Sequence, residues 1–240
     1  MTGASKRDLR RALRANRAGR SRADVEQAGA DLAGHAEALV GETIALYAGI
    51  DSEPPTINLL AALLRRGTRI LLPVLRSDMD LEWAPVGGVG ELTTSPYGLL
   101  EPSRRSLGTE GIREADLVLA PGLAVDLSGV RLGQGGGCYD RALARVSVSI
   151  YVVLFDGEIV EWLPSEAHDH PVDGTLTPSG GLERIQAGGR GWSPESDRSL
   201  GSDPTPEATQ TRATTHKMRY SRPVIGNSVA LAAIQSQENS

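Results

Sequence analysis

The first part of the chain shows apolar positions at helical spacing behind polar residues that suit helix starts. Ser5 and Ser21 are each followed three residues later by an aspartate, which resembles the capping box that opens many helices. We therefore predict two amino-terminal helices, over residues 5–18 and 22–39.

Apolar runs then alternate with a second helical pattern. Residues 43–48 form a short run rich in strand formers, leucines keep helical spacing between Pro55 and Gly67, and residues 69–74 form the next apolar run. A strand, a helix and a strand in this order usually make a parallel pair with a right-handed crossover. The pattern predicts such a unit here.

Further strands are expected along the chain, and a helix is expected over about 137–146, between the strands at 116–120 and 149–154. Continuous apolar character favours strands that are covered on both faces. The fold class predicted is α/β, with an open, mostly parallel sheet flanked by helices, and with additional strands at residues 81–85, 116–120, 149–154 and 158–160.

The composition changes after residue 185. Glycine, serine, threonine, proline, glutamine and charged residues dominate residues 188–217 without a helical or strand period. The run at 224–234 is apolar but isolated. We expect one domain over 1–185 and a disordered tail over 186–240.

Composition and charge narrow the function classes. A net charge of -5 opposes the positive field with which proteins hold nucleic acid, and no apolar run approaches the roughly 20 residues of a membrane span. Cys138 is the single cysteine, which excludes an internal disulfide and fits a reducing compartment. We expect a cytoplasmic protein that binds neither nucleic acid nor membrane, although the arginine-rich start leaves a transit peptide open.

A glycine-rich segment stands out before the helix expected at 137. It reads Arg131-Leu132-Gly133-Gln134-Gly135-Gly136-Gly137-Cys138-Tyr139-Asp140-Arg141. Glycines let consecutive backbone N–H groups turn towards one anion, and a helix N-terminus adds partial positive charge. The segment predicts a phosphate cradle. A flexible turn is the alternative, and a Walker loop is excluded because no Gly-Lys-Ser/Thr follows.

Charged residues bracket this segment. Asp126 and Asp140 could hold Mg²⁺ through oxygen ligands, and Arg131 and Arg141 could bind phosphate oxygens. Such a mixture suits a nucleotide with its metal. The alternative is a set of exposed ion pairs that contributes little.

Two basic residues of the first predicted helix share one face. Lys6 and Arg10 are four residues apart and could reach the same polyphosphate. A solvated basic face is the alternative, because Arg7, Arg11 and Arg14 make a rival stripe.

Two acidic segments lie in predicted loops. Glu53 follows the first strand, where a carboxylate can face a substrate amine or a pterin-like ring, or act as a helix N-terminal acid. Residues 166–173 contain His168 and His170, whose spacing does not fit the helical zinc motif. An acid/base pair or metal site is conceivable there, and a loop surface is the alternative.

Several segments in this order resemble 5-formyltetrahydrofolate cyclo-ligases, also called methenyltetrahydrofolate synthetases. The resemblance runs from Lys6 to about Thr177. Besides the glycine-rich segment it rests on Lys6 with Arg10, Glu53 with Thr56, Leu72-Pro73, the runs at 97–102 and 121–126, and Leu163-Pro164 leading to His168-Asp169.

The resemblance implies a sugar-phosphate-isomerase-like α/β fold and a reaction that uses ATP and Mg²⁺ to turn 5-formyltetrahydrofolate into 5,10-methenyltetrahydrofolate. It also implies site residues. Carried over by position, the catalytic residues are Lys6, Arg131 and Arg141; ATP is bound by Lys6, Arg10, Arg131, Leu132, Gly133, Gln134, Gly135, Gly136, Gly137, Cys138 and Tyr139; folate is bound by Glu53 and residues 134–138; and Asp140 and Asp169 bind the metal.

The sequence departs from the family at Cys138, where tyrosine is common, so an aromatic contact with the folate is in doubt there. A reactive thiol at a helix N-terminus is an alternative role. A non-catalytic folate- or nucleotide-binding relative remains open, as does an enzyme acting on a sugar phosphate, since fold is a poor guide to chemistry. We expect a monomer or a weak homodimer.

Overall fold

The computed structural model describes residues 5–166 and 169–185. The expected tail at 186–240 lies outside them. The main elements in chain order are α1 (Lys6–Ala18), α2 (Arg22–Gly34), β1 (Thr43–Ala45), α3 (Ile57–Arg65), β2 (Arg69–Leu75), β3 (Leu81–Val86), β4 (Leu92–Thr94), β5 (Leu100–Pro102), β6 (Leu117–Pro121), β7 (Ala124–Asp126), β8 (Arg131–Leu132), α4 (Cys138–Leu143), β9 (Ser149–Val153), β10 (Ile159–Val160), β11 (Gly174–Thr177) and β12 (Gly181–Arg184).

Both amino-terminal helices begin where their caps predict. The Ser5 and Ser21 hydroxyls accept hydrogen bonds from backbone amides three residues later. The prediction that the second helix reaches residue 39 is wrong. It ends at Gly34 and a separate 3₁₀ turn covers Ala36–Ala38, because glycine disfavours helix continuation.

Seven strands form the central sheet, in the order β12-β11-β9-β6-β1-β2-β3. The five inner strands are parallel, and β12 and β3 are antiparallel at the edges. The predicted unit of strand, helix and parallel strand at β1, α3 and β2 is therefore confirmed, as is the α/β class with a mostly parallel sheet.

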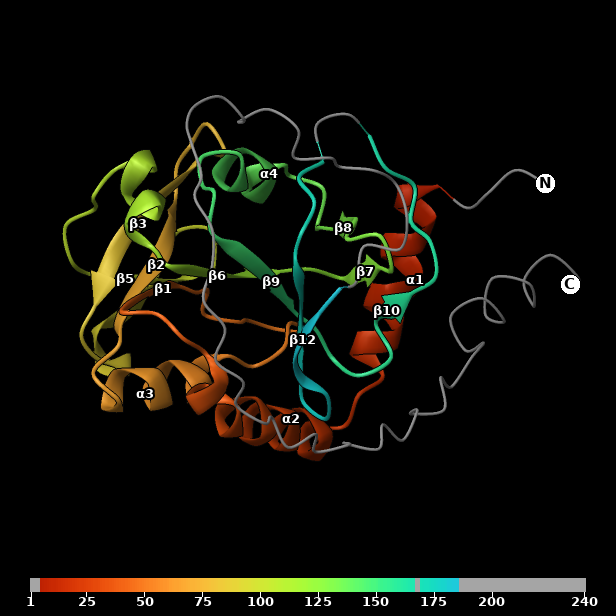
Figure 1. The fold of residues 1–240 in the computed structure, drawn as a ribbon, viewed down its shortest axis with the longest axis horizontal. Coiled ribbons are helices and arrows are strands. Elements are labelled where there is room, and N and C mark those ends of the chain that lie inside the picture. Colours follow the sequence, from red (N-terminus) through yellow and green to blue (C-terminus); the bar gives the residue numbers. More distant parts are fainter. Residues whose placement is uncertain (1–4, 167–168, 186–240) are drawn as a thin grey trace, which may run out of the picture.

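Helices cover both faces of this sheet (Figure 1). Leucines of α2 and α3 pack into the core cluster on one face, and Ala142 and Leu143 of α4 pack into the cluster on the other. From β1 the chain crosses through α3 to β2 on one side, while β6 and β9 lie on the other side of β1. The direction of winding thus reverses between β1 and β6.

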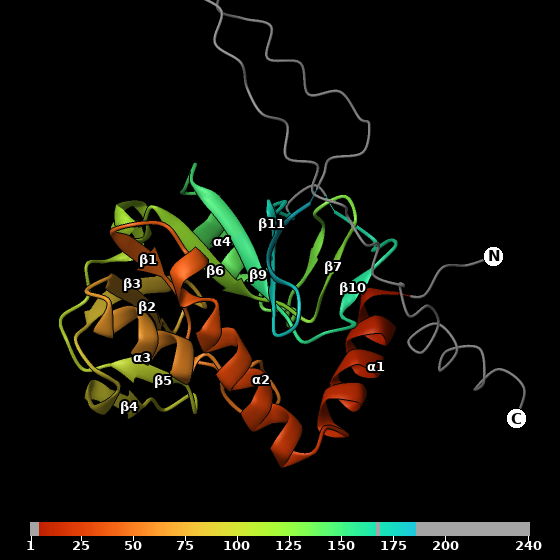
Figure 2. The same ribbon diagram turned by 60° about the horizontal axis from the view of Figure 1, so that its bottom comes forward.

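The helix α1 packs elsewhere, beside the small sheet β10-β7-β8 (Figure 2). Its Leu13 is buried against Leu123, Ala124 and Leu132. This packing leaves the start of α1 near the segment that follows β8.

Several elements differ from the expectations. The helix predicted over 137–146 covers only Cys138–Leu143, because Gly137 caps it in a left-handed conformation and the chain turns after Ala144. The β7-β8 and β4-β5 pairs and the strands β11 and β12 were not predicted. No helix in the described residues is both long and apolar enough to cross a membrane.

Candidate active site

A cavity of about 270 Å³ lies at the carboxyl ends of the parallel strands. Tyr47 follows β1, Leu75 ends β2, and Pro121 and Gly122 lie at the end of β6; all four line it. Open α/β sheets bind ligands at the carboxyl edge where the winding reverses. The position alone marks this cavity as the candidate site.

The glycine-rich segment forms one wall of the cavity. Gly135 and Gly137 have φ angles of 106° and 68°, which L side chains rarely adopt. Within the described residues, no backbone amide from Gln134 to Gly137 donates a hydrogen bond to a protein acceptor. Four backbone donors without an acceptor in the described residues lie next to the start of α4 and form a cradle that suits an anion.

Two arginines of α1 hold this cradle in shape. Arg10 Nε donates to the Gly133 carbonyl at 2.9 Å, and Arg14 Nη2 donates to the Gln134 carbonyl at 2.9 Å. The carbonyl and the N–H of a trans peptide point in opposite directions. With these two carbonyls turned towards α1, the amides of Gln134 and Gly135 face away from it.

Lys6 bridges the start of α1 to the loop after β10. Its ammonium donates to Asp169 Oδ2 at 2.7 Å and to Glu166 Oε2 at 3.0 Å. Burial acts to lower the pKa of Lys6, but the hydrogen bonds to Asp169 and Glu166 outweigh it and raise the pKa above its usual value. Lys6 therefore carries its charge throughout the physiological pH range.

Arg131 joins three parts of the site. Its guanidinium donates to Asp140 Oδ1 at 2.6 Å and to the Pro121 carbonyl at 3.0 Å, and it lies 5.9 Å from the centre of the Tyr139 ring. The Arg131 side chain is nearly fully buried. This ion pair ties the start of α4 to the end of β6.

Asp126 does not lie open to a metal as the sequence suggested. It is buried, and its carboxylate accepts hydrogen bonds from the Ser128, Val130 and Leu163 amides and from the Ser128 hydroxyl. These bonds use its oxygen lone pairs. Its role is to hold the turn between β7 and β8 and to dock the loop at Leu163.

Glu53 lines the cavity where the chain turns after β1. Burial raises the pKa of its carboxyl group, while the Ile50 amide and the Gln134 side chain donate hydrogen bonds to it and oppose the rise. The hydroxyls of Tyr47 and Tyr139 are buried without a protein partner in the described residues. These three polar groups line the cavity together with Arg131, Gln134 and Asp140.

Arg141 and Cys138 occupy the outer rim. Arg141 is exposed, and its Nη2 donates to the carbonyls of Met79 and Gly136. Cys138 Sγ lies 3.8 Å from the Gly136 carbonyl oxygen. Burial raises the pKa of the Cys138 thiol although Arg141 acts to lower it, which argues against the reactive-thiol interpretation.

Alkylation with iodoacetamide should therefore be slow at neutral pH. Because only the thiolate reacts, we expect the rate to rise with a pH midpoint above that of free cysteine, about 8.5. Mass spectrometry of the labelled protein measures this directly. Cys138→Ser controls for labelling at other residues, and a midpoint below that of free cysteine would restore the reactive-thiol interpretation.

The predicted metal ligands Asp140 and Asp169 each pair with a cation, as described above. No three Asp, Glu, His or Cys side chains gather as a metal site within 5–166 and 169–185. Mg²⁺ commonly uses one or two carboxylates together with substrate phosphates, so a separate protein cage is not required. His170 contacts the Pro171 carbonyl, and His168 lies outside the described residues.

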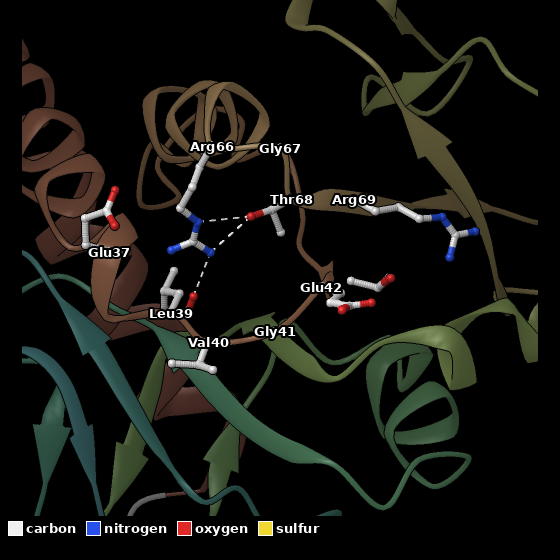
Figure 3. Close-up of a pocket in the computed structure, with 10 residues that line it drawn as sticks. Glu37, Leu39, Val40, Gly41, Glu42, Arg66, Gly67, Thr68 and Arg69 are labelled. Carbon is white, nitrogen blue, oxygen red and sulfur yellow. Dashed lines mark hydrogen bonds between the residues drawn. The ribbon is translucent and has the colours of Figure 1, made fainter.

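A second, larger hollow of about 600 Å³ lies at the opposite edge of the sheet, near the starts of β1 and β2 (Figure 3). The Arg66 guanidinium there binds the Leu39 carbonyl and Thr68, and Arg69 pairs with Glu114. The hollow is open, and it contains none of the residues predicted for the site.

Sequence reasoning missed three contributors. Arg14 was assigned to a rival stripe, yet it lies on the Lys6 face and binds Gln134. Its spacing of eight residues from Lys6 was the available signal. Glu166 lies in the acidic segment at 166–173 that the sequence marked as a candidate, but its contact with Lys6 joins distant parts of the chain and was not predicted. Tyr47 carried no signal in the sequence.

Comparisons with known proteins agree with this geometry. Residues 2–178 match the sequence profile of the 5-formyltetrahydrofolate cyclo-ligase family. The 5-formyltetrahydrofolate cyclo-ligase of Mycolicibacterium smegmatis is 40% identical over 78% of this chain and 100% of its own. That of Escherichia coli is 30% identical over 64% of this chain and 87% of its own.

A solved structure agrees in both fold and sequence. The 5,10-methenyltetrahydrofolate synthetase of Aquifex aeolicus superposes with a TM-score of 0.65 at 26% identity, over 80% of this chain and 97% of that one. The region that matches the family profile, residues 2–178, includes the glycine-rich segment, Glu53 and Lys6. The chain therefore belongs to the 5-formyltetrahydrofolate cyclo-ligase family of enzymes.

Proposed function

We propose that this protein converts 5-formyltetrahydrofolate to 5,10-methenyltetrahydrofolate and releases ADP and phosphate from ATP. The observation that carries the proposal is that one cavity combines two different kinds of binding surface. A cradle of unpaired backbone amides suits a polyphosphate, and an apolar recess with Glu53 suits a ring that carries N–H donors. Family membership supports the same pairing.

ATP fits the side of the site that is built by α1 and the glycine-rich segment. Lys6, Arg10 and Arg141 supply positive charge around the amides of residues 134–137, which accounts for phosphate binding by charge and backbone donors together. Arg131 is proposed to orient this wall through Asp140. Mg²⁺ would be held by Asp140 and Asp169 with phosphate oxygens, and it supplies neutralisation of the phosphate charge.

The folate ring fits the recess between Glu53 and the tyrosines. A volume of about 270 Å³ lies just below the roughly 300–1,000 Å³ of small-molecule pockets, so the recess suits the ring while the rest of the substrate extends outwards. The Glu53 carboxylate accepts hydrogen bonds from the ring, and Tyr47 and Tyr139 offer hydroxyls. Residues 134–138 complete the contact from the loop side.

The chemistry follows from the poor reactivity of an N-formyl group, whose nitrogen lone pair is delocalised. The formyl oxygen takes the γ-phosphoryl group and ADP leaves. N10 then attacks the formyl carbon, the C–O bond breaks, phosphate departs and N10 loses its proton. Positioning and charge neutralisation dominate such a reaction, which is consistent with a site rich in cations and amides.

An oxygen label tests both the activity and its route. With ¹⁸O in the formyl group of the substrate, we expect one labelled oxygen in the released phosphate for each methenyl product formed. Mass spectrometry of the phosphate reads the label. Product formation with unlabelled phosphate would contradict phosphorylation of the formyl oxygen, and turnover of a sugar phosphate without ATP would favour a different enzyme.

Glu53 should produce a pH dependence of kcat/KM for the folate. Only its ionised form accepts two ring donors, so kcat/KM should fall as the pH drops through a pKa that burial holds above the usual glutamate value. In Glu53→Gln we expect kcat/KM to fall about 10- to 100-fold, since hydrogen bonds to a charged group contribute about 1.5–3 kcal/mol. The acid limb should disappear with it.

The matched control is Asp51→Asn, two residues away and exposed. Asp51 has a φ angle of 50°, and asparagine tolerates that conformation. This variant should keep the wild-type kcat/KM at neutral pH once the enzyme-free reaction is subtracted, and its acid limb should move slightly to lower pH, because the charge of Asp51 raises the Glu53 pKa. An unchanged acid limb in Glu53→Gln would remove Glu53 from the folate site.

A cytoplasmic location and a monomer or weak homodimer remain part of the same proposal.

A further inference from the structure

Arg14 binds a single residue of the cradle through two atoms. Its Nε donates to the side-chain oxygen of Gln134 at 2.9 Å, and its Nη2 donates to the Gln134 carbonyl at 2.9 Å. A guanidinium has donors and no acceptors. The Gln134 side-chain oxygen must therefore face Arg14, and the amide nitrogen must face the other way.

Glu53 lines the same cavity as Gln134, and a hydrogen bond from the Gln134 side chain acts to lower the pKa of the Glu53 carboxyl group. Only the amide nitrogen of Gln134 can donate that bond. The opposite orientation of the amide would set its oxygen against the carboxylate and its N–H groups against the guanidinium, and both contacts are repulsive. A free glutamine side chain flips easily, since its last torsion is broad. Arg14 removes that freedom.

We propose that Arg14 is a positioning residue for folate, which fixes the Gln134 amide so that it donates to Glu53 and holds this carboxylate in place for the substrate ring. The inference rests on the proposed function of the cavity. Arg14 does not line the cavity, so it acts through Gln134.

The effect of Arg14 on Gln134 can be measured through the pKa of Glu53, which depends on the groups around its carboxylate. Glu53 is faced by Asp51 on its own loop, by Arg17 of α1, by Gln134, and by the Tyr47 and Tyr139 side chains. Of these, Gln134 is the group that Arg14 controls. Loss of the Gln134 hydrogen bond should raise the Glu53 pKa and move the acid limb of kcat/KM to higher pH.

A double-mutant cycle tests the inference. In Arg14→Ala and in Gln134→Ala we expect KM for 5-formyltetrahydrofolate to rise about 10-fold, which corresponds to one hydrogen bond to a charged group. The double variant should be no worse than the more impaired single variant, because both substitutions break one chain of contacts. The acid limb should move upwards in all three.

Arg11→Ala is the matched control, since Arg11 is exposed on the same helix and pairs with Asp8. It should behave like the wild type. Multiplicative effects in the cycle, an unmoved acid limb, or an unchanged KM in Arg14→Ala would each overturn the positioning role. A wild-type protein without turnover would instead overturn the proposed function, so the two failures are distinguishable.

Discussion

Replacement of Lys6 by alanine should reduce kcat by about 100-fold or more while the protein stays folded. The Lys6 ammonium is held by Asp169 and Glu166, one helical turn before Arg10, which contacts the glycine-rich segment, and its raised pKa keeps it charged. A fixed cation that stabilises charge developing in a transition state contributes about 10²–10³-fold to kcat. Steady-state rates at saturating ATP and folate measure the loss.

Arg7→Ala provides the comparison, because Arg7 is an exposed cation on the neighbouring face of the same helix. That variant should keep wild-type kcat. Thermal unfolding followed by circular dichroism must show that Lys6→Ala is folded. If kcat of the folded Lys6→Ala protein stays within a few-fold of the wild type, Lys6 is not part of the catalytic machinery and its interaction with Asp169 is only structural.

Removal of the Arg17 side chain should have the largest effect on stability. Arg17 is buried, and its guanidinium donates to both oxygens of Glu158 and to the Gly122 carbonyl. Arg17→Ala leaves Glu158 as a buried charge without its cation, which typically costs about 3–5 kcal/mol. Urea denaturation should show this loss in the free energy of unfolding.

Two further variants test whether the loss of stability is specific to the buried pair of Arg17 and Glu158. Arg22→Ala removes an exposed i,i+4 pair with Glu26 and should leave the unfolding midpoint nearly unchanged. The double substitution Arg17→Met with Glu158→Leu should recover much of the stability lost in Arg17→Ala, because it removes both charges. Equal loss in the double and single variants would show that packing around Arg17, and not its charge, holds α1 to the body.

The elements that were predictable are those whose signals are local. The apolar runs at 43–48 and 69–74 and the leucines of α3 each form a pattern within a few residues, so the parallel pair β1-β2 could be predicted. β8 has only two residues, Arg131 and Leu132, which is too short to show alternation. The second helix was predicted to reach residue 39 because the apolar residues after position 34 were given more weight than Gly34, where the helix in fact ends.

In the candidate site, too, the features with local sequence signals were predictable and those that depend on distant contacts were not. The glycine-rich segment was recognisable because its glycines and flanking charges lie within eleven residues. The contacts that shape it join distant segments: Arg14 and Gln134 are 120 residues apart, and Lys6 and Asp169 are 163 residues apart. Asp126 looked like a metal ligand, since burial and hydrogen bonds to backbone amides cannot be seen in residue type and spacing.

The most direct test of the proposed function is the near-UV absorbance of the methenyl product. At neutral pH, purified protein with Mg²⁺, ATP and 5-formyltetrahydrofolate should form this chromophore in amounts matched by released ADP, and without ATP it should form no more than the enzyme-free reaction does. The folded wild-type protein failing to produce it would contradict the proposal. In that case calorimetric binding of folate or ATP without turnover would identify the protein as a non-catalytic member of the family.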